Sequence, residues 1–375
     1  MSIHVIYRTE SYDREELYGI VKKHFEAHGI KNELSETTRV LIKPNLVTNK
    51  DAAFVVTTNP ELVFAVVRYL KSIGIKNITL ADCPGGSLLL FSQMQEIYSD
   101  TGYSFLGEHV HMNTDFESRD VESPTGSVNK KFNIINAVAD ADYVINLPKL
   151  KTHNLTCITA GVKNLFGCIP GLQKPAFHAK YPSAKDFSNM LVELAQTVKP
   201  SFTLVDAVDI MEGNGPTNGK RRHLGLTFSS KDVFGLDAFI TETLGIPQES
   251  VATVQASKAK NLISNDFAAQ GDTNFVLGNP ILLPESYRAK SGTDKLAAKI
   301  NSLFRKIGDA VFESYPQMTE KCVLCRKCIL TCPKNALKIE NGKIVVDKKR
   351  CIGCLCCDEV CPNAAVKIRK KIKKH

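Results

Sequence analysis

The sequence predicts two parts of unequal size: an α/β domain with a mostly parallel sheet over residues 1–290, and a small cysteine-rich α+β domain over residues 316–375. Two observations predict this division. Short apolar runs alternate with amphipathic segments through the first 280 residues, the pattern of an α/β domain. Nine of the twelve cysteines lie between Cys322 and Cys361. The chain, at 375 residues, is long enough for a sizeable core beside this segment.

The clearest unit of the α/β domain lies near its start. A β-rich run at 40–47 ends at a Pro-Asn turn, Asn59-Pro60 then opens a helix that closes at Gly74, and a further strand follows at 77–82. This order is a βαβ unit, so we expect its two strands to be parallel. Further strands are expected at 141–147, 201–208 and 224–230, and helices at 155–166, 185–198 and 232–244.

The segment between the two domains is expected to start with a loop at 281–292. Thr293 can cap a helix whose apolar residues form a single stripe. We expect this amphipathic helix to link the domains over residues 291–315, and Pro316 to mark the boundary.

The C-terminal domain contains an internal repeat of cysteine spacing. The pattern C-x2-C-x2-C-x3-C-P occurs twice and ends at Pro333 and Pro362. Three cysteines of such a run surround one iron–sulfur cube, and the fourth reaches the other cube. The sequence therefore predicts two [4Fe–4S] clusters, one held by Cys322, Cys325, Cys328 and Cys361 and the other by Cys351, Cys354, Cys357 and Cys332.

A hairpin is expected between the two motifs, because residues 336–346 form two alternating runs around Asn341-Gly342. This domain resembles the bacterial two-cluster ferredoxins over its whole length, which implies electron transfer. Four-cysteine zinc sites fit less well, because zinc ribbons use two cysteine pairs for each ion. Cys356 lies outside the repeat; we interpret it as a packed thiol, with a substitute ligand or a redox role as alternatives.

Positive charge is concentrated in the same domain. The whole chain has a formal net charge of +9, whereas residues 320–375 hold 15 Lys and Arg against 5 Asp and Glu, a balance of +10. Clusters bound by thiolates are anionic, so these cations offset that charge and present a basic face to an acidic redox partner protein. We prefer this interpretation to nucleic-acid binding, which a basic tail also permits.

The expected location is the cytoplasm. The first residues lack the basic-then-apolar pattern of a secretory signal, and no run of about 18 apolar residues predicts a membrane span. Dense C-x-x-C runs in such a chain are typical of metal ligation in a reducing compartment.

The stretch from Leu147 to His178 concentrates cations, histidines and glycines, which suits an anionic ligand near backbone amides. Ligands of open α/β sheets bind at the carboxyl ends of strands, where Asp206, Asp209 and the loop 212–216 are also expected. Asp237 is expected at the surface. We expect a pocket for a small anionic substrate lined by Lys43, Asn45, Gly85, Gly86, Lys149, Lys151, His153, Lys163 and Asn164.

Two family resemblances bear on this stretch. The segments IKPNLV, NPELV, LADCPGG, LPKLKTH, GVKNLFGCIPG and VDAVDIMEGNGP resemble the family catalogued as "domain of unknown function 362" over roughly residues 38–245, a family that often carries a two-cluster ferredoxin domain. His153, Lys163 and His178 with Ile169-Pro170-Gly171 are also similar to the central stretch of nickel-pincer lactate racemases. That similarity implies Lys163 as a cofactor anchor and the histidines as nickel ligands or acid/base residues. The upstream Thr-His segment of those enzymes has no counterpart here.

The function expected from these observations is that of an iron–sulfur oxidoreductase. It relays electrons between a partner protein and a small anionic substrate, with Lys163, His153 and His178 as catalytic candidates. One alternative is a non-enzymatic electron carrier whose large domain docks a partner. The other is a racemase- or lyase-like enzyme with a nickel-type cofactor.

Overall fold

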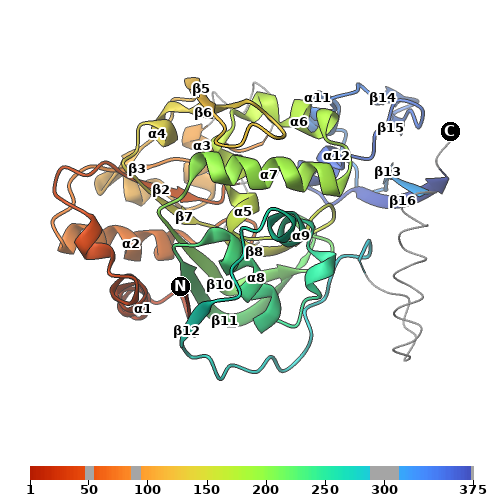
Figure 1. Cartoon of the computed structure of the whole chain (residues 1–375). Coiled ribbons are helices and arrows are strands. Elements are labelled where there is room, and N and C mark those ends of the chain that lie inside the picture. The colour runs from red at the N-terminus through yellow and green to blue at the C-terminus, as the bar shows by residue number, and fades with distance from the viewer. Residues whose placement is uncertain (47–54, 86–93, 288–311, 373–375) are drawn as a thin grey trace.

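The computed structural model describes residues 1–46, 55–85, 94–287 and 312–372 (Figure 1). Most of the predicted linking helix at 291–315 lies outside these residues. Its last residues are wrong as a helix, because strand β13 begins at Phe312. The domain boundaries at 290 and 316 stay a prediction. Within the described residues, no helix is long and apolar enough to cross a membrane.

The larger domain is built on one sheet, whose strand pairs are mostly parallel, as the sequence predicts. Strands β1 and β10 both pair antiparallel with β11. Beyond the end of β7, β8 (Lys149–His153) pairs with β10, and β9 (Cys157–Thr159) pairs with β8. The main order is β12 (Phe267–Gly271), β1 (Ser2–Arg8), β11 (Lys220–Ser230), β10 (Phe202–Glu212), β7 (Tyr143–Leu147), β2 (Val40–Pro44), β3 (Ile78–Leu80) and β4 (His111–Met112).

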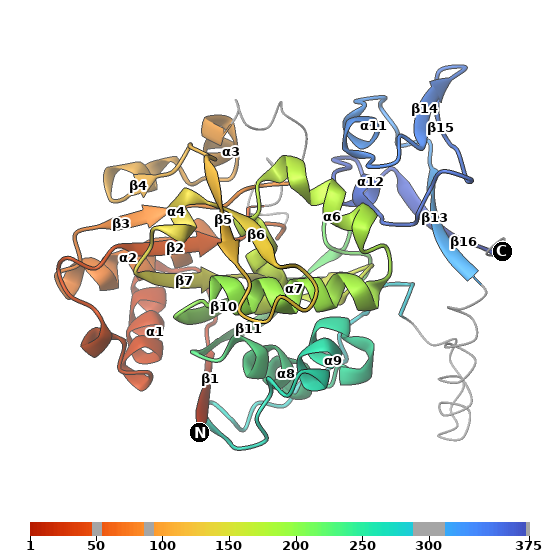
Figure 2. The same cartoon turned by 45° about the horizontal axis from the view of Figure 1, so that its top comes forward.

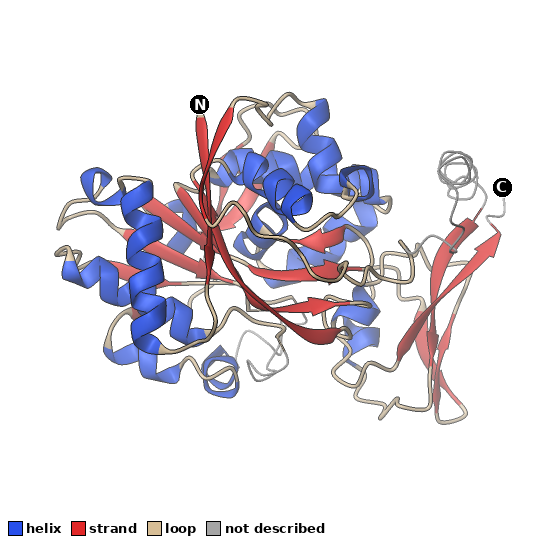
Figure 3. Ribbon diagram, turned by 90° about the horizontal axis from the view of Figure 1, so that it is seen from below, coloured by secondary structure: helices blue, strands red, loops and turns tan. Residues whose placement is uncertain are grey.

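Helices cover both faces of this sheet (Figure 3). Side chains alternate between faces along a strand, and β11 shows the result: Thr227 and Ser229 bond to His24 of α1 (Arg14–Ala27), whereas Phe228 packs in one cluster with Leu236 of α8 (Val233–Thr243). Helix α2 (Pro60–Ser72) contacts α1, and α7 (Ala184–Val198) contacts α9 (Ala252–Ala259).

The predicted βαβ unit is confirmed. Strands β2 and β3 pair in parallel, with Val40 opposite Ile78. Between them, α2 begins after Asn59, whose side chain accepts a hydrogen bond from Glu61 N, and Pro60 occupies the first turn. Its apolar stripe is buried, so this local prediction matches the tertiary packing.

The helix predicted at 155–166 is wrong over its first half. Residues Cys157–Thr159 form β9, which pairs antiparallel with β8. Gly161–Asn164 form the short helix α5, and the 3-10 helix η5 (Leu165–Cys168) follows it directly. The carboxylate of Asp237 accepts the backbone N–H groups of Gly161 and Val162 and so defines where α5 begins. Asp237 is therefore buried, not at the surface as expected, and burial raises its pKa to about 7.

The C-terminal module lies at one end of the α/β domain (Figure 2). The expected hairpin is present: Asn341 and Gly342, both with positive φ, connect β14 (Leu337–Glu340) to β15 (Lys343–Val346). The module also contains the antiparallel pair β13 (Phe312–Met318) and β16 (Val366–Ile372), and the short helices α11 (Lys327–Thr331) and α12 (Cys356–Glu359).

Candidate functional site

Two cavities in the C-terminal module are each lined by cysteines from both motifs. We call them site I and site II. Four thiols with apolar neighbours are the donor set of a [4Fe–4S] cube, so these residues fit that group. Site I is lined by Cys322, Cys325, Cys328 and Cys361, and site II by Cys332, Cys351, Cys354 and Cys357 together with Cys356.

The backbone supports one thiol of each site in the same way. Cys332 Sγ accepts a hydrogen bond from Ala336 N, and Cys361 Sγ accepts one from Ala365 N, both at 3.2 Å. Hydrogen bonds to ligand sulfur stabilise its anionic form and adjust the potential of a bound cluster. The last cysteine of each sequence motif therefore accepts the same backbone hydrogen bond.

Helix α12 joins the module to the α/β domain. Asn154 Nδ2 and Asn218 Nδ2 each donate to the carboxylate of Asp358, at 2.8 Å, and Thr217 Oγ1 donates to its backbone oxygen at 3.4 Å. Burial raises the pKa of Asp358 to about 6. Since Asp358 follows Cys357 directly, these bonds hold the edge of site II against the larger domain.

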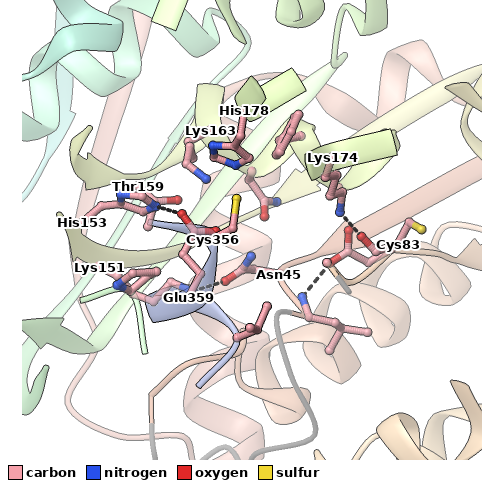
Figure 4. A pocket seen from close by; sticks show the side chains of 18 of the residues that line it. Asn45, Cys83, Lys151, His153, Thr159, Lys163, Lys174, His178, Cys356 and Glu359 are labelled. Carbon is pink, nitrogen blue, oxygen red and sulfur yellow. Dashed lines mark hydrogen bonds and ion pairs between the residues drawn. The ribbon is translucent and has the colours of Figure 1, made fainter. Parts of the chain in front are cut away.

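A third cavity, of about 90 Å³, lies between the two domains (Figure 4); we call it the central cavity. Cys356 lines both this cavity and site II, so this residue borders the two spaces. Of the side chains predicted from the sequence, the structure gathers Asn45, Gly85, Lys151, His153, Lys163, Asn164 and His178 in its lining. The module contributes Thr331, Cys356, Glu359 and Val360.

A neutral histidine faces a carboxylate in this cavity. His153 Nδ1 accepts a hydrogen bond from Leu155 N at 3.0 Å, so its proton lies on Nε2, which is 3.1 Å from Glu359 Oε1. Burial, with the charge of Lys163, lowers the pKa of His153 to about 4. Burial alone would raise the pKa of Glu359, but Lys163 and His153 outweigh it and hold that pKa well below its usual range.

The lysines of the cavity differ in what they contact. Lys151 Nζ donates to Asn45 Oδ1 at 2.5 Å and to Val56 O at 2.6 Å, and burial lowers its pKa strongly. Lys174 Nζ donates to the backbone oxygen of Cys83. Lys163 is half-buried beside the ring of Phe166 and makes no ion pair or hydrogen bond within the described part of the chain. Its ammonium group can therefore still form an ion pair with a bound anion.

Two further polar atoms of the cavity have no partner. His178 Nδ1 and Asn164 Oδ1 are buried and accept or donate no hydrogen bond among the residues that the structure describes. Burial lowers the pKa of His178 to about 4, so its ring is neutral. Buried polar atoms are normally paired, and these two are positioned to bind a ligand or water.

Some predicted residues do not reach the central cavity. Lys43 is fully buried and pairs with Asp82 at 2.7 Å, so it holds a lining carboxylate without lining the space itself. Lys149 pairs with Asp206 at 2.9 Å and donates to Tyr12 Oη at 2.7 Å, away from the lining. Gly86 lies outside the described residues.

The carboxylates predicted at the strand ends also lie away from the central cavity. Asp209 pairs with Arg221 at 2.7 Å and contacts His223, so neither Asp206 nor Asp209 belongs to the lining. The loop 212–216 contributes one residue, Pro216.

Sequence reasoning missed the contribution of the module to this cavity. Glu359 and Val360 lie about 200 residues from His153, and periodicity carries no signal across that distance. Lys174 lies inside the cationic stretch and could have been chosen with Lys163. The sequence shows Cys356 as a cysteine outside the repeat, but it does not show that this residue lines two cavities.

Three comparisons with known proteins bear on identity. Residues 40–242 match the family described as domain of unknown function (DUF362), and residues 316–362 match a 4Fe-4S dicluster domain. The "Thylakoid-associated protein sll1697" of Synechocystis is 34% identical over 276 residues, which are 73% of this chain and 83% of that protein.

A solved structure is more distantly similar. The lactate racemase apoprotein from Thermoanaerobacterium thermosaccharolyticum shares 15% identity at a TM-score of 0.39, over 64% of this chain and 57% of that chain, less than two thirds of its length. The family match covers more than half of this chain and includes most of the central-cavity residues. The chain therefore belongs to the domain of unknown function 362 family and carries a 4Fe–4S dicluster domain at its C-terminal end.

Proposed function

We propose that this protein is an iron–sulfur oxidoreductase that exchanges electrons between two [4Fe–4S] clusters, at sites I and II, and a small anionic substrate in the central cavity. The observation that carries the proposal is the position of Cys356, which lines both site II and the cavity. A substrate there would lie one side chain from a cluster. Thiolate-bound clusters suit a reducing compartment such as the cytoplasm.

In this proposal the cavity residues bind the substrate and supply protons. The clusters supply one electron at a time. Lys163 pairs with the anionic group, because its ammonium makes no ion pair or hydrogen bond among the described residues. Reduction of an organic acceptor by two electrons consumes two protons, and oxidation releases them. The unpartnered Nδ1 of His178 is the atom that exchanges these protons, and the Nε2–H of His153, held toward Glu359, orients the substrate by donating a hydrogen bond.

The cavity supports substrate chemistry over the alternative of a docking domain. A surface that only docks a partner needs no cavity lined by unpaired polar atoms, whereas a binding site needs one. The racemase-like alternative requires nickel and a phosphate-bearing cofactor. Metal content therefore separates it from the oxidoreductase.

The first experiment is anaerobic purification followed by iron, sulfide, nickel and phosphorus analysis with EPR. We expect about eight irons, the content of two cubes, and no stoichiometric nickel. Stoichiometric nickel with phosphorus would replace the proposal by the racemase-like alternative. Zinc in place of iron would exclude both the oxidoreductase and the racemase-like enzyme.

The second experiment tests the cavity. Photoreduced protein is mixed with a panel of small carboxylates, and cluster reoxidation is followed by absorbance. Lys163→Ala should weaken the binding of an active carboxylate by about 10- to 100-fold, because a charge-assisted hydrogen bond is lost. Lys185→Ala, at an exposed lysine of α7, is the matched control. Equal affinities in both variants would remove Lys163 from the site, and reoxidation by no carboxylate would favour the electron carrier.

A further inference from the structure

The two cluster sites differ in their access to solvent. In site I Cys325 is exposed although Cys328 is only 7% exposed, whereas in site II Cys354 and Cys357 are 9% and 7% exposed and no ligand cysteine is fully exposed. Next to Cys325, Val323 is 66% and Leu324 36% exposed. The edge of site I therefore opens to solvent, while site II lies toward the central cavity.

The residues around site I form a patch with apolar and cationic members. Leu330, 57% exposed, lies three positions after Lys327 on α11, so both are on one face of that helix. Leu324 and Arg326 adopt positive φ in the turn that precedes it. The site I patch consists of Val323, Leu324 and Leu330 with the exposed cations Lys321, Arg326 and Lys327.

The positive charge at the surface of the module is offset by fewer carboxylates than its composition suggests. Of the 5 acidic residues in 320–375, Asp358 is held by Asn154 and Asn218, and Glu359 faces His153 in the cavity. These two carboxylates cannot offset the exposed cations of the site I patch. Glu320, exposed next to Lys321, offsets one of the three cations, so the patch stays positive. An acidic surface is therefore its electrostatic complement.

We propose that the site I patch is the docking surface for a small acidic electron-carrier protein of ferredoxin type. The apolar residues beside Cys325 form the centre of the contact and the cations its rim, the arrangement of a small transient interface. In each encounter the reduced carrier loses one electron and site I gains it, with no proton transferred. This deepens the proposed function, on which it rests for the onward path through site II to the cavity.

A second copy of the chain is a poorer occupant of this patch. Residues 320–375 carry a balance of +10, so two copies of the module repel each other. The same charge accelerates the approach of an acidic carrier, and salt suppresses that effect.

The test measures docking and cluster reduction without any substrate. Binding of a purified acidic plant-type ferredoxin is measured by calorimetry, and its reduction of the clusters by stopped flow, at 50 mM and 500 mM salt. Lys321→Glu with Arg326→Glu should slow reduction and weaken binding by about tenfold at low salt, and much less at high salt. Lys31→Glu with Lys185→Glu, both exposed on the larger domain, makes the same charge change as a control. Leu330→Ser tests the apolar centre at an exposed position.

Direct photoreduction by a deazaflavin serves as the reference reaction and should be the same in all variants. Equal slowing in the control pair would overturn the proposal, since only net charge would matter. Slowing of photoreduction to the same degree would also overturn it, as would self-association through the patch in sedimentation. A failure here with intact reoxidation by a carboxylate would leave the proposed function standing.

Discussion

At the scale of single residues, a glycine leaves room for a buried ion pair at the central cavity. A Cβ on Gly167 would lie 1.9 Å from Asp82 Oδ1 and 2.6 Å from Lys43 Nζ. The pair has almost no solvent exposure. Disrupting one member of such a pair leaves an uncompensated buried charge.

We therefore expect Gly167→Ala to lower the free energy of unfolding by about 3 kcal/mol, and to weaken binding in the cavity that Asp82 lines. Urea unfolding checks the first effect. Gly278→Ala is the control, because a Cβ there meets nothing within 4 Å. Equal stabilities of the two variants would show that the ion pair relaxes without cost.

Cys356 supplies a second residue-scale prediction. Its side chain lines site II together with Cys354, two residues earlier, where a thiol can donate to ligand sulfur. In Cys356→Ala the iron content should stay unchanged, while the potential of one cluster falls because its ligand sulfur loses a donor. An EPR-monitored redox titration measures this, with Cys168→Ala as the control thiol. Loss of iron from Cys356→Ala would instead identify Cys356 as a ligand.

At the scale of elements, α1 packs on β11 through buried neutral histidines. His24 contacts Ser229 at 2.7 Å and Thr227 at 2.8 Å, and His28, at the end of the helix, contacts Ser229 at 3.0 Å. Burial lowers the pKa of His24 strongly and that of His28 to about 4. Both rings are therefore neutral in the folded protein at pH 7.

The pH dependence of stability follows from these shifts. Below the ordinary histidine pKa of about 6.5 the unfolded chain binds protons that the folded protein does not. The free energy of unfolding should fall between pH 6.5 and 4, by at most about 1.4 kcal/mol per pH unit for each histidine. His28→Asn should make this slope shallower in urea titrations from pH 7 to 5.5. An unchanged slope would place the protonation elsewhere.

At the scale of the whole molecule, α12 couples the module to the α/β domain. Removing both amides in Asn154→Ala with Asn218→Ala deletes the two bonds to Asp358. Hydrogen bonds to charged groups contribute about 1.5–3 kcal/mol each, so the docked arrangement should be at least tenfold less favoured. Cluster content should stay the same, while hydrogen exchange of residues 356–360 and the delay before substrate reoxidation both increase.

The control for this pair is Asn32→Ala with Asn274→Ala, which removes two exposed amides from the larger domain. If exchange at α12 is unchanged in the Asn154 and Asn218 variant, the module is held by other contacts. If exchange rises but reoxidation does not slow, electrons reach the substrate by another route.

Local signals predicted much of the fold. The unit β2–α2–β3 follows from residues close in sequence: a capping Asn59, a proline in the first turn and one apolar stripe. The hairpin around Asn341-Gly342 is equally local. The helix predicted at 155–166 failed because β8 and Asp237, which is remote in sequence, decide its local structure. Apolar periodicity describes only neighbouring residues, so it does not show when a distant strand or side chain pairs with the same segment.

The sequence by itself determined that the C-terminal domain has the cysteine pattern of an iron–sulfur domain. It also showed that Lys163, His153 and His178 lie in one cation-rich stretch. Cysteine spacing and short-range charge are properties of the chain, so they need no fold to be visible. Only the tertiary structure decided that Glu359 and Cys356 complete the central cavity. It also decided that Lys43 and Lys149 form ion pairs with buried carboxylates and do not line the cavity. Contacts across about 200 residues depend on packing, because each is made only when both domains are folded and docked.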